Sequence, residues 1–81
     1  MVNVKTSDHF EKILNKIDNT LKIQLSKIVS KIISNPKIGK PMRFGRKGTR
    51  EMYVGHFRLS YLYDKGADTI YLLNLYHKDE Q

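Results

Sequence analysis

Cysteine is absent from the 81 residues of this chain. Disulfide bonds and thiolate metal sites are therefore excluded, which fits a reducing compartment. No apolar run approaches the roughly 20 residues that a membrane-spanning helix requires. The N-terminal stretch MVNVKTSDHF lacks the charged start and apolar centre of a secretory signal peptide. We therefore expect one cytoplasmic domain, residues 1–81, without a membrane segment.

Negative charge is also scarce. The chain carries 15 Lys and Arg against 8 Asp and Glu, a formal net charge of +7. Such an excess on a small domain attracts polyanions, nucleic acid among them, although a solvated lysine-rich surface is the alternative. Arginine, which the two expected helices lack, appears only in the middle of the chain and beyond. The cations of residues 37–58 are Lys37, Lys40, Arg43, Arg46, Lys47, Arg50 and Arg58, against the single carboxylate of Glu51.

Apolar periodicity predicts two helices followed by strands. Residues 10–17 and 21–33 carry apolar side chains at helical spacing. Thr6 or Ser7 can cap the first helix, and Pro36 ends the second. In the second half the period changes to two, and glycine marks the turns. With a short strand in VNVKT, we predict an α+β fold of order β-α-α-β-β-β, in which a helical hairpin packs on one face of an antiparallel sheet.

The turn at Gly55-His56 predicts how the last three strands pair. A two-residue hairpin turn at this place sets Tyr53 opposite Arg58. Regular alternation, continued into the last strand, sets Leu75 opposite Arg58 and His77 opposite His56. The face that the helices leave uncovered is then expected to carry Glu51, Tyr53, Arg58, Ser60 and His77.

Such a face has the groups needed to cleave a phosphate ester. Arg58 can bind phosphate bidentately and stabilise the charge of a phosphorane. His77 titrates near neutrality and can protonate a leaving 5′ oxygen, while Glu51 can accept the proton of a ribose 2′-OH. Tyr53 or Tyr71 can stack on a base. Together they predict RNA cleavage without metal or cofactor, with backbone contacts from Arg43, Arg46, Lys47, Arg50 and Lys78.

Each of these residues also has a structural interpretation. A strand arginine often pairs with a nearby carboxylate, as Arg58 can with Glu51. His77 can be an exposed histidine without a role, and His56 a turn residue. No tight cluster of His, Asp and Glu indicates a metal site.

Three stretches resemble the RelE/ParE superfamily of toxins from bacterial and archaeal toxin–antitoxin systems. SNPKIGKPM is similar to the segment that leaves the family's second helix, TREMYVGHFRLSYLYD to its hairpin motif, and IYLLNLYHKDEQ to its last strand. By this resemblance Arg58 matches the hairpin arginine, His77 a histidine that closes the last strand, and Lys78 a basic position of RelE. Arg50 falls near the basic pair of the second strand. The resemblance covers nearly the whole chain and implies the same fold.

The resemblance also implies a function. RelE-like toxins cut mRNA in the ribosomal A site without a metal, and a cognate antitoxin holds them inactive. The implied partners are therefore the ribosome, mRNA and a RelB-like antitoxin, with a monomeric toxin that forms a hetero-oligomer. The alternative is a non-catalytic protein, either a ParE-like toxin directed at gyrase or an inactive member that only binds an antitoxin. The presence of both Arg58 and His77 favours the nuclease.

Overall fold

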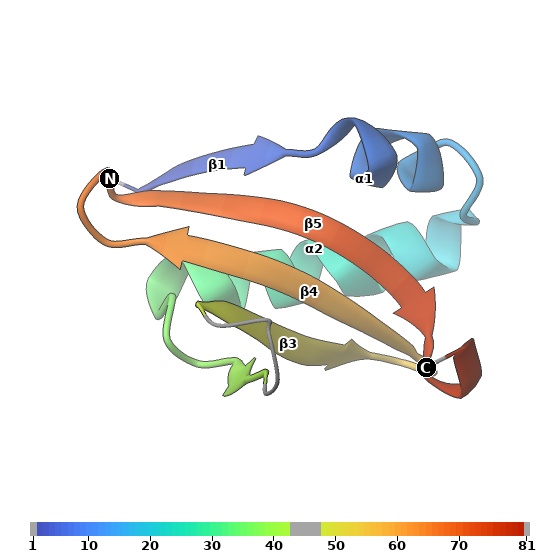
Figure 1. Cartoon of the computed structure of the whole chain (residues 1–81). Helices are drawn as coiled ribbons and strands as arrows, with labels where there is room; N and C mark the ends of the chain where they lie inside the picture. Colours follow the sequence, from blue (N-terminus) through green and yellow to red (C-terminus); the bar gives the residue numbers. More distant parts are fainter. Residues whose placement is uncertain (1, 43–47, 81) are drawn as a thin grey trace.

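The computed structural model describes residues 2–42 and 48–80. Its elements form a five-stranded sheet in the order β1-β5-β4-β3-β2, with α2 across one face (Figure 1). The predicted α+β fold and its order are confirmed, with one further short strand, β2. The elements are β1 (Asn3–Thr6), α1 (Asp8–Leu14), α2 (Asn19–Ser34), β2 (Lys40–Pro41), β3 (Thr49–Val54), β4 (Phe57–Asp64), β5 (Thr69–His77) and the 3₁₀ helix η1 (Lys78–Glu80).

Side-chain caps begin both helices. Ser7 Oγ accepts the Phe10 N–H at 3.0 Å, so Ser7 is the cap of α1. Asp18 Oδ1 accepts the Leu21 N–H at 2.8 Å and begins α2. The second helix ends at Ser34, before the Asn35-Pro36 pair, as predicted.

The sheet is mixed rather than wholly antiparallel. Strands β3, β4 and β5 form the predicted antiparallel meander, but β1 pairs with β5 in parallel. Parallel neighbours need a crossover connection, and here it contains both helices and the strands β2, β3 and β4. Strand β2 adds two residues to the outer edge of β3.

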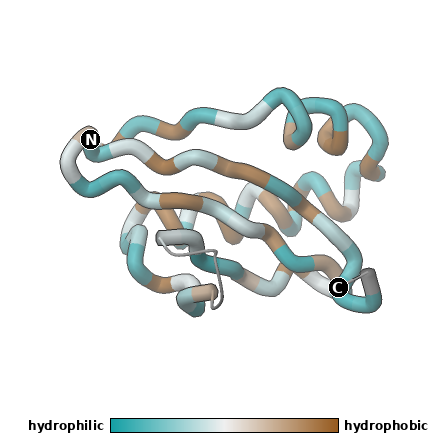
Figure 2. Tube along the Cα trace, viewed as in Figure 1, coloured by the Kyte–Doolittle hydropathy of each residue, from teal (hydrophilic) through white to brown (hydrophobic). Residues whose placement is uncertain are grey.

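The core lies between the helices and one face of the sheet. Figure 2 shows apolar segments alternating with polar ones along β4, the expected pattern for a strand covered on one face. Within the described residues, no helix is long and apolar enough to cross a membrane. The buried apolar side chains are Phe10, Leu25, Ile32, Val54, Leu59, Tyr61, Ile70, Leu72 and Leu75.

The pairing of β3 with β4 is the predicted one. Gly55 adopts a φ of 61°, a conformation that glycine allows without strain, in the tight turn between the strands. Tyr53 faces Arg58 and Glu51 faces Ser60. The expected neighbours of Arg58 on β3 are therefore confirmed.

The pairing of β4 with β5 departs from the prediction at Leu73. Leu72 faces Tyr61, but the next residue of β4, Ser60, faces Asn74. Leu73 is therefore an extra residue, a β-bulge, and it reverses the alternation of every residue after it.

Two consequences correct the sequence-based pairing. Arg58 faces Tyr76 and not Leu75, and His77 faces Phe57 and not His56. Because residues paired across antiparallel strands share a face, His77 lies on the Phe57 side of the sheet and Tyr76 on the Arg58 side.

The bulge has a packing cause and a polar support. Leu72 and Leu75 are both at most 5% exposed, although they are three residues apart, so one residue must break the alternation between them. Ser7 supplies the support, since its N–H donates to the Leu72 carbonyl at 3.1 Å and its Oγ to the Leu73 carbonyl at 2.9 Å.

Candidate functional site

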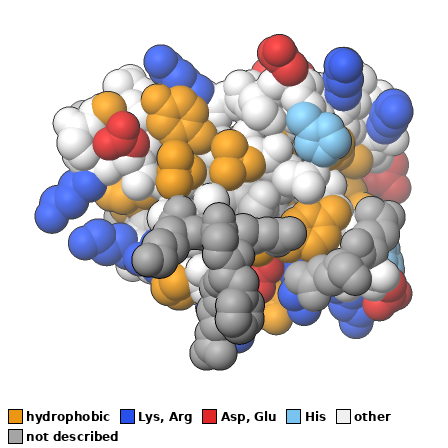
Figure 3. Space-filling view, viewed as in Figure 1, with side chains coloured by type: hydrophobic (Ala, Val, Ile, Leu, Met, Phe, Trp, Pro, Cys, Tyr) orange, Lys and Arg blue, Asp and Glu red, His pale blue; other side chains and the backbone are white. Residues whose placement is uncertain are grey.

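The sheet face opposite α2, called the open face below, carries the candidate site. Figure 3 views the molecule from this side and shows apolar side chains near the middle with most of the Lys and Arg side chains at the periphery. The register of β3, β4 and β5 places on this face Glu51, Tyr53, Arg58, Ser60, Asn74 and Tyr76.

Arg58 is held between two of its predicted neighbours. Its NH1 lies 3.7 Å from Glu51 Oε1, and the two side chains are 20% and 13% exposed. Its Cζ lies over the Tyr53 ring, 5.1 Å from the centroid. The carboxylate and the aromatic face both favour the cation, so the guanidinium is fixed in place at the surface of the sheet.

Tyr76 is a member of this site that the sequence analysis missed. The bulge turns it to the open face opposite Arg58, and its hydroxyl donates to Glu51 Oε2 at 3.3 Å. Glu51 is thus contacted by a cation and by a phenol at its two oxygens. The spacing of Leu72 and Leu75 was the signal that could have revealed the change of face.

One donor of Arg58 has no acceptor among the described residues. The Nε atom is buried and without a hydrogen-bond partner there. A buried donor without an acceptor costs roughly 1–3 kcal/mol, and such groups in native proteins need an explanation. The Arg58 side chain is 20% exposed, but Nε itself is enclosed, so a phosphate that bound the fork of Nε and a terminal nitrogen would first have to displace the groups around Nε.

His77 does not join Arg58, so the predicted grouping of these two on one face is wrong. Its ring meets Phe57 edge-on at 5.3 Å and stacks beside His56 at 6.4 Å. Its Nδ1 lies 3.4 Å from Asp79 Oδ2. The reason for the error is the bulge, which turns the side chain at position 77 away from the open face.

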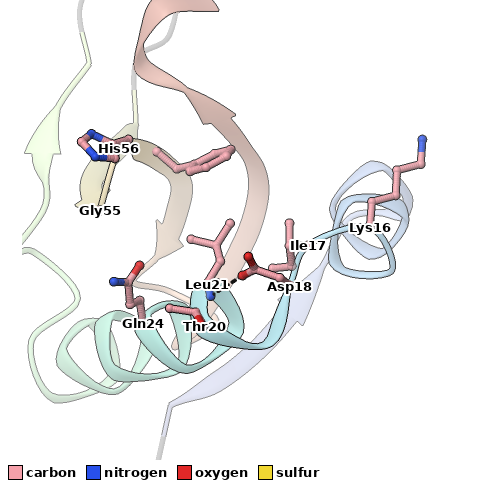
Figure 4. A pocket seen from close by; sticks show the side chains of 9 residues that line it. Lys16, Ile17, Asp18, Thr20, Leu21, Gln24, Gly55 and His56 are labelled. Atoms are coloured by element: carbon pink, nitrogen blue, oxygen red, sulfur yellow. Dashed lines mark hydrogen bonds between the residues drawn. The ribbon is translucent and has the colours of Figure 1, made fainter.

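A cleft lies at this end of the molecule, between the start of α2 and the β3–β4 turn. Its volume is about 530 Å³, and Thr20, Gln24 and His56 line it (Figure 4). No described residues form a group of three or more His, Asp or Glu side chains that could hold a metal ion, there or elsewhere.

Among the predicted phosphate-binding cations that the structure describes, Arg50 lies away from Arg58. Arg50 faces Tyr61 on the helix side of the sheet, and its NH1 donates to the carbonyls of Lys37 at 3.1 Å and Gly39 at 2.8 Å. Lys78 is exposed in η1. The remaining three predicted contacts, Arg43, Arg46 and Lys47, lie outside the described residues.

Tyr61 is a core residue, and its hydroxyl anchors the chain that enters β2. The phenol donates to the Pro36 carbonyl at 2.8 Å and accepts the Gly39 N–H at 2.9 Å. Burial raises the pKa of Tyr61 above its ordinary value of 10.0. A Cβ on Gly39 would lie 2.6 Å from the same hydroxyl, so glycine is required there. Tyr61 and Arg50 together fix the segment that precedes the basic residues 43–47.

Solved structures show the same fold. A chain of the intact RelBE toxin–antitoxin complex of E. coli matches with a TM-score of 0.84 at 15% identity, over 95% of this chain and 96% of that one. A chain of the RelBE2 complex of Mycobacterium tuberculosis matches with a TM-score of 0.78 at 24% identity, over 95% and 98%. A metal-bound toxin from Helicobacter pylori matches with a TM-score of 0.75 at 27% identity, over 99% and 98%.

The sequence itself matches a family model. No curated protein sequence matches the chain. Residues 4–81, however, match the model of the ParE toxin of type II toxin–antitoxin systems, parDE. This match covers both helices, the whole meander and every residue of the site. The chain therefore belongs to the ParE toxin family of type II toxin–antitoxin systems, within the RelE/ParE superfamily.

Proposed function

We propose that the chain is a RelE-like toxin that cleaves mRNA on the ribosome through attack by a ribose 2′-OH. The observation that carries this proposal is the guanidinium of Arg58 on the open face, in a side chain that is 20% exposed and is positioned by Glu51 and Tyr53. A preorganised cation of this kind stabilises the negative charge that builds on the phosphorane.

Glu51 and Tyr76 are the proposed proton carriers. The Glu51 carboxylate takes the 2′-OH proton while a bond forms between O2′ and phosphorus. The bond from phosphorus to O5′ breaks, and the Tyr76 hydroxyl gives its proton to that oxygen. When the product has left, the hydrogen bond between Glu51 and Tyr76 re-forms and Glu51 returns its proton to Tyr76, which leaves both residues as they began. The products are a 2′,3′-cyclic phosphate and a 5′-hydroxyl. Tyr76 takes the place that the sequence analysis assigned to His77.

The geometry requires the phosphate to enter between the two carriers. Attacking and leaving oxygens lie on opposite sides of phosphorus in an in-line displacement, so the base and the acid must flank it. Glu51 Oε2 and the Tyr76 hydroxyl lie 3.3 Å apart without RNA, and a phosphate on Arg58 would separate them. Binding at Arg58 therefore prepares both proton transfers.

The surroundings of Arg58 suit a single-stranded message. Tyr53 is 62% exposed, and an exposed aromatic ring on a sheet is a stacking surface for a base. Lys40 is exposed and pairs with Glu51 across β2 and β3, and its positive charge favours the RNA backbone. We propose further backbone contacts from Lys78 and from Arg43, Arg46 and Lys47.

A RelB-like antitoxin is the proposed inhibitor. The E. coli and M. tuberculosis relatives are toxin–antitoxin complexes. In this chain an apolar groove of about 390 Å³ runs between α1 and α2, with Phe10, Leu25 and Val29 among its lining. Ile33 also lines the groove and is 40% exposed. Such a groove accepts the apolar face of an antitoxin helix, so we propose a hetero-oligomer of an otherwise monomeric toxin.

A non-catalytic, gyrase-directed toxin is the second candidate. Two observations favour it, the match to the ParE family model and the separation of His77 from Arg58. Under this function the Arg58–Glu51 pair is a structural ion pair of the sheet.

Primer extension on mRNA from cells that express the chain tests the two candidates. Cleavage in register with codons is expected for the wild type, and Arg58→Ala is expected to reduce the rate by roughly 10²–10³-fold, by analogy with the loss of one oxyanion-hole donor. Lys27→Ala is the matched control, since it removes an exposed cation from α2. Growth arrest with intact mRNA and damaged DNA would establish the gyrase-directed toxin instead.

A further inference from the structure

We infer that His9 and Asn74 form a nucleobase-binding subsite beside Arg58 that selects the base next to the cleaved phosphate. The inference rests on the proposed function at Arg58. Asn74 is half-buried on the open face, where it faces Ser60. The exposed His9 ring joins it, with Nε2 3.1 Å from Asn74 Oδ1.

The bulge at Leu73 aims Asn74 at this face. Without the extra residue, Asn74 would follow Leu72 in alternation with one residue between them, and both would point to the helices. Bulges commonly redirect side chains near functional sites. Ser7 holds the bulge and also caps α1, of which His9 is the second residue. One set of contacts therefore fixes both members of the subsite.

The subsite is within one nucleotide of Arg58. Arg58 faces Tyr76, and Asn74 is two residues earlier on the same strand. Diagonal neighbours across antiparallel strands lie roughly 7–8 Å apart. Ser60, whose side chain is small and only 8% exposed, lies opposite Asn74 and two residues from Arg58 on β4, so no large side chain of β4 separates Asn74 from Arg58.

The two side chains offer the right groups for a base edge. With His9 donating through Nε2 to Asn74 Oδ1, the amide of Asn74 keeps its Nδ2 donors and a second lone pair on Oδ1. When the Nε2 atom of His9 carries the proton, its Nδ1 atom is a hydrogen-bond acceptor. Donors and acceptors side by side recognise the Watson–Crick or Hoogsteen edge of an unstacked base in single-stranded RNA. The asparagine amide complements adenine in particular.

The distribution of cut sites, mapped by primer extension in cells, tests this subsite. The wild type is compared with His9→Ala, His9→Gln and Asn74→Ser, and the matched controls His56→Ala and Asn15→Ala change exposed residues in the β3–β4 turn and at the end of α1. His9→Ala and Asn74→Ser are expected to weaken the base preference beside the cut roughly tenfold, and His9→Gln to restore part of it. Thermal unfolding of each purified variant shows which of them remain folded.

Unchanged cut sites in folded His9→Ala and Asn74→Ser would overturn the subsite, and a lower melting temperature with the same sites would show that the contact only pins α1 to β5.

If the wild type does not cut, binding of four homopolymeric RNA oligonucleotides is measured by fluorescence anisotropy. Base-dependent loss of binding in the two variants supports the subsite and refutes the nuclease. Equal binding by variants and wild type, or no binding at all, overturns the subsite.

Discussion

The β3–β4 and β4–β5 hairpins share strand β4, yet different interactions determine their registers. In the first, a two-residue turn with Gly55 at a φ of 61° leads directly into regular pairing. In the second, a longer turn is followed by a bulge whose carbonyl is bound by Ser7, 66 residues away in the chain. The first register is a local property of the sequence, and the second depends on the assembled fold.

Deleting Leu73 is expected to cause the largest loss of stability, because it removes the bulge that distinguishes the two hairpins. The shortened β5 must either turn Leu75 out of the core or shift every pair beyond the bulge, and losing a buried leucine costs ~2–5 kcal/mol. A domain of this size has little stability to lose. Urea unfolding should therefore show loss of most of the stability. Deleting Gly66 in the turn is the control for chain length, and equal stability of the two deletions would contradict the role of the bulge.

Tyr76→Phe and His77→Ala compare neighbours that the bulge places on opposite faces. The first removes the proposed proton donor to O5′, and loss of a general acid lowers the rate by roughly 10²–10⁴-fold. The second changes a residue on the Phe57 side and should leave the rate near that of the wild type. Single-turnover cleavage on programmed ribosomes measures both. A large loss in His77→Ala with none in Tyr76→Phe would restore the original assignment.

Ser7→Ala is expected to destabilise the β4–β5 hairpin more than the β3–β4 hairpin. It removes the cap of α1 and the hydrogen bond to the Leu73 carbonyl, with an expected cost of about 1–2 kcal/mol. Amide hydrogen exchange should accelerate at residues 72–75 and remain slow at residues 51–54 and 57–60. Uniform acceleration over both hairpins would show that the serine stabilises the domain only globally.

Gly55→Ala tests the local turn. An alanine at a φ of 61° is strained by ~1–2 kcal/mol, and its Cβ would lie 3.0 Å from Gln24 Oε1. Gly66→Ala is the matched control, because its nearest contact to an added Cβ, Asp64 Oδ1, lies at 3.5 Å. Chemical denaturation should show a loss for the first and almost none for the second. Equal losses would remove the special role of the two-residue turn.

The smallest expected effect is that of alkaline pH on the free energy of unfolding. Burial raises the pKa of Tyr61 above 10.0, so its neutral form is favoured in the folded state. The free energy of unfolding should therefore be insensitive to this group below pH 10.0 and fall as the pH rises above it. Denaturation midpoints from pH 8 to 11 should fall less steeply for Tyr61→Phe than for the wild type, and parallel curves would contradict this linkage.

Sequence patterns predicted the features that depend on residues close together in the chain. The helices, a cap at Thr6 or Ser7, the turn at Gly55 and the Arg58–Glu51 contact follow from periodicity, capping and turn geometry over a few residues, and the structure identifies Ser7 as the cap. The face of β5 beyond Leu73 could not be predicted in this way, because a serine from the other end of the chain stabilises the bulge.

The residues of the candidate site were likewise predicted correctly where local pairing controls them and wrongly beyond the bulge. Its residues from β3 and β4 were predicted, whereas Tyr76 was missed and His77 was placed on the wrong face. Arg50 shows a second limit, since a cation that suits phosphate also suits two backbone carbonyls, and only the fold decides between them.

The Ser7 hydroxyl also bears on the order in which the domain folds. It accepts from the Phe10 amide within the first turn of α1, whereas its bond to the Leu73 carbonyl forms only after the last strand has docked. A loop closed over 66 residues forms late, because its entropy is lost before the contact forms. The bulge of β5 and its contact with the cap of α1 therefore reach their final form together, in a late step of folding.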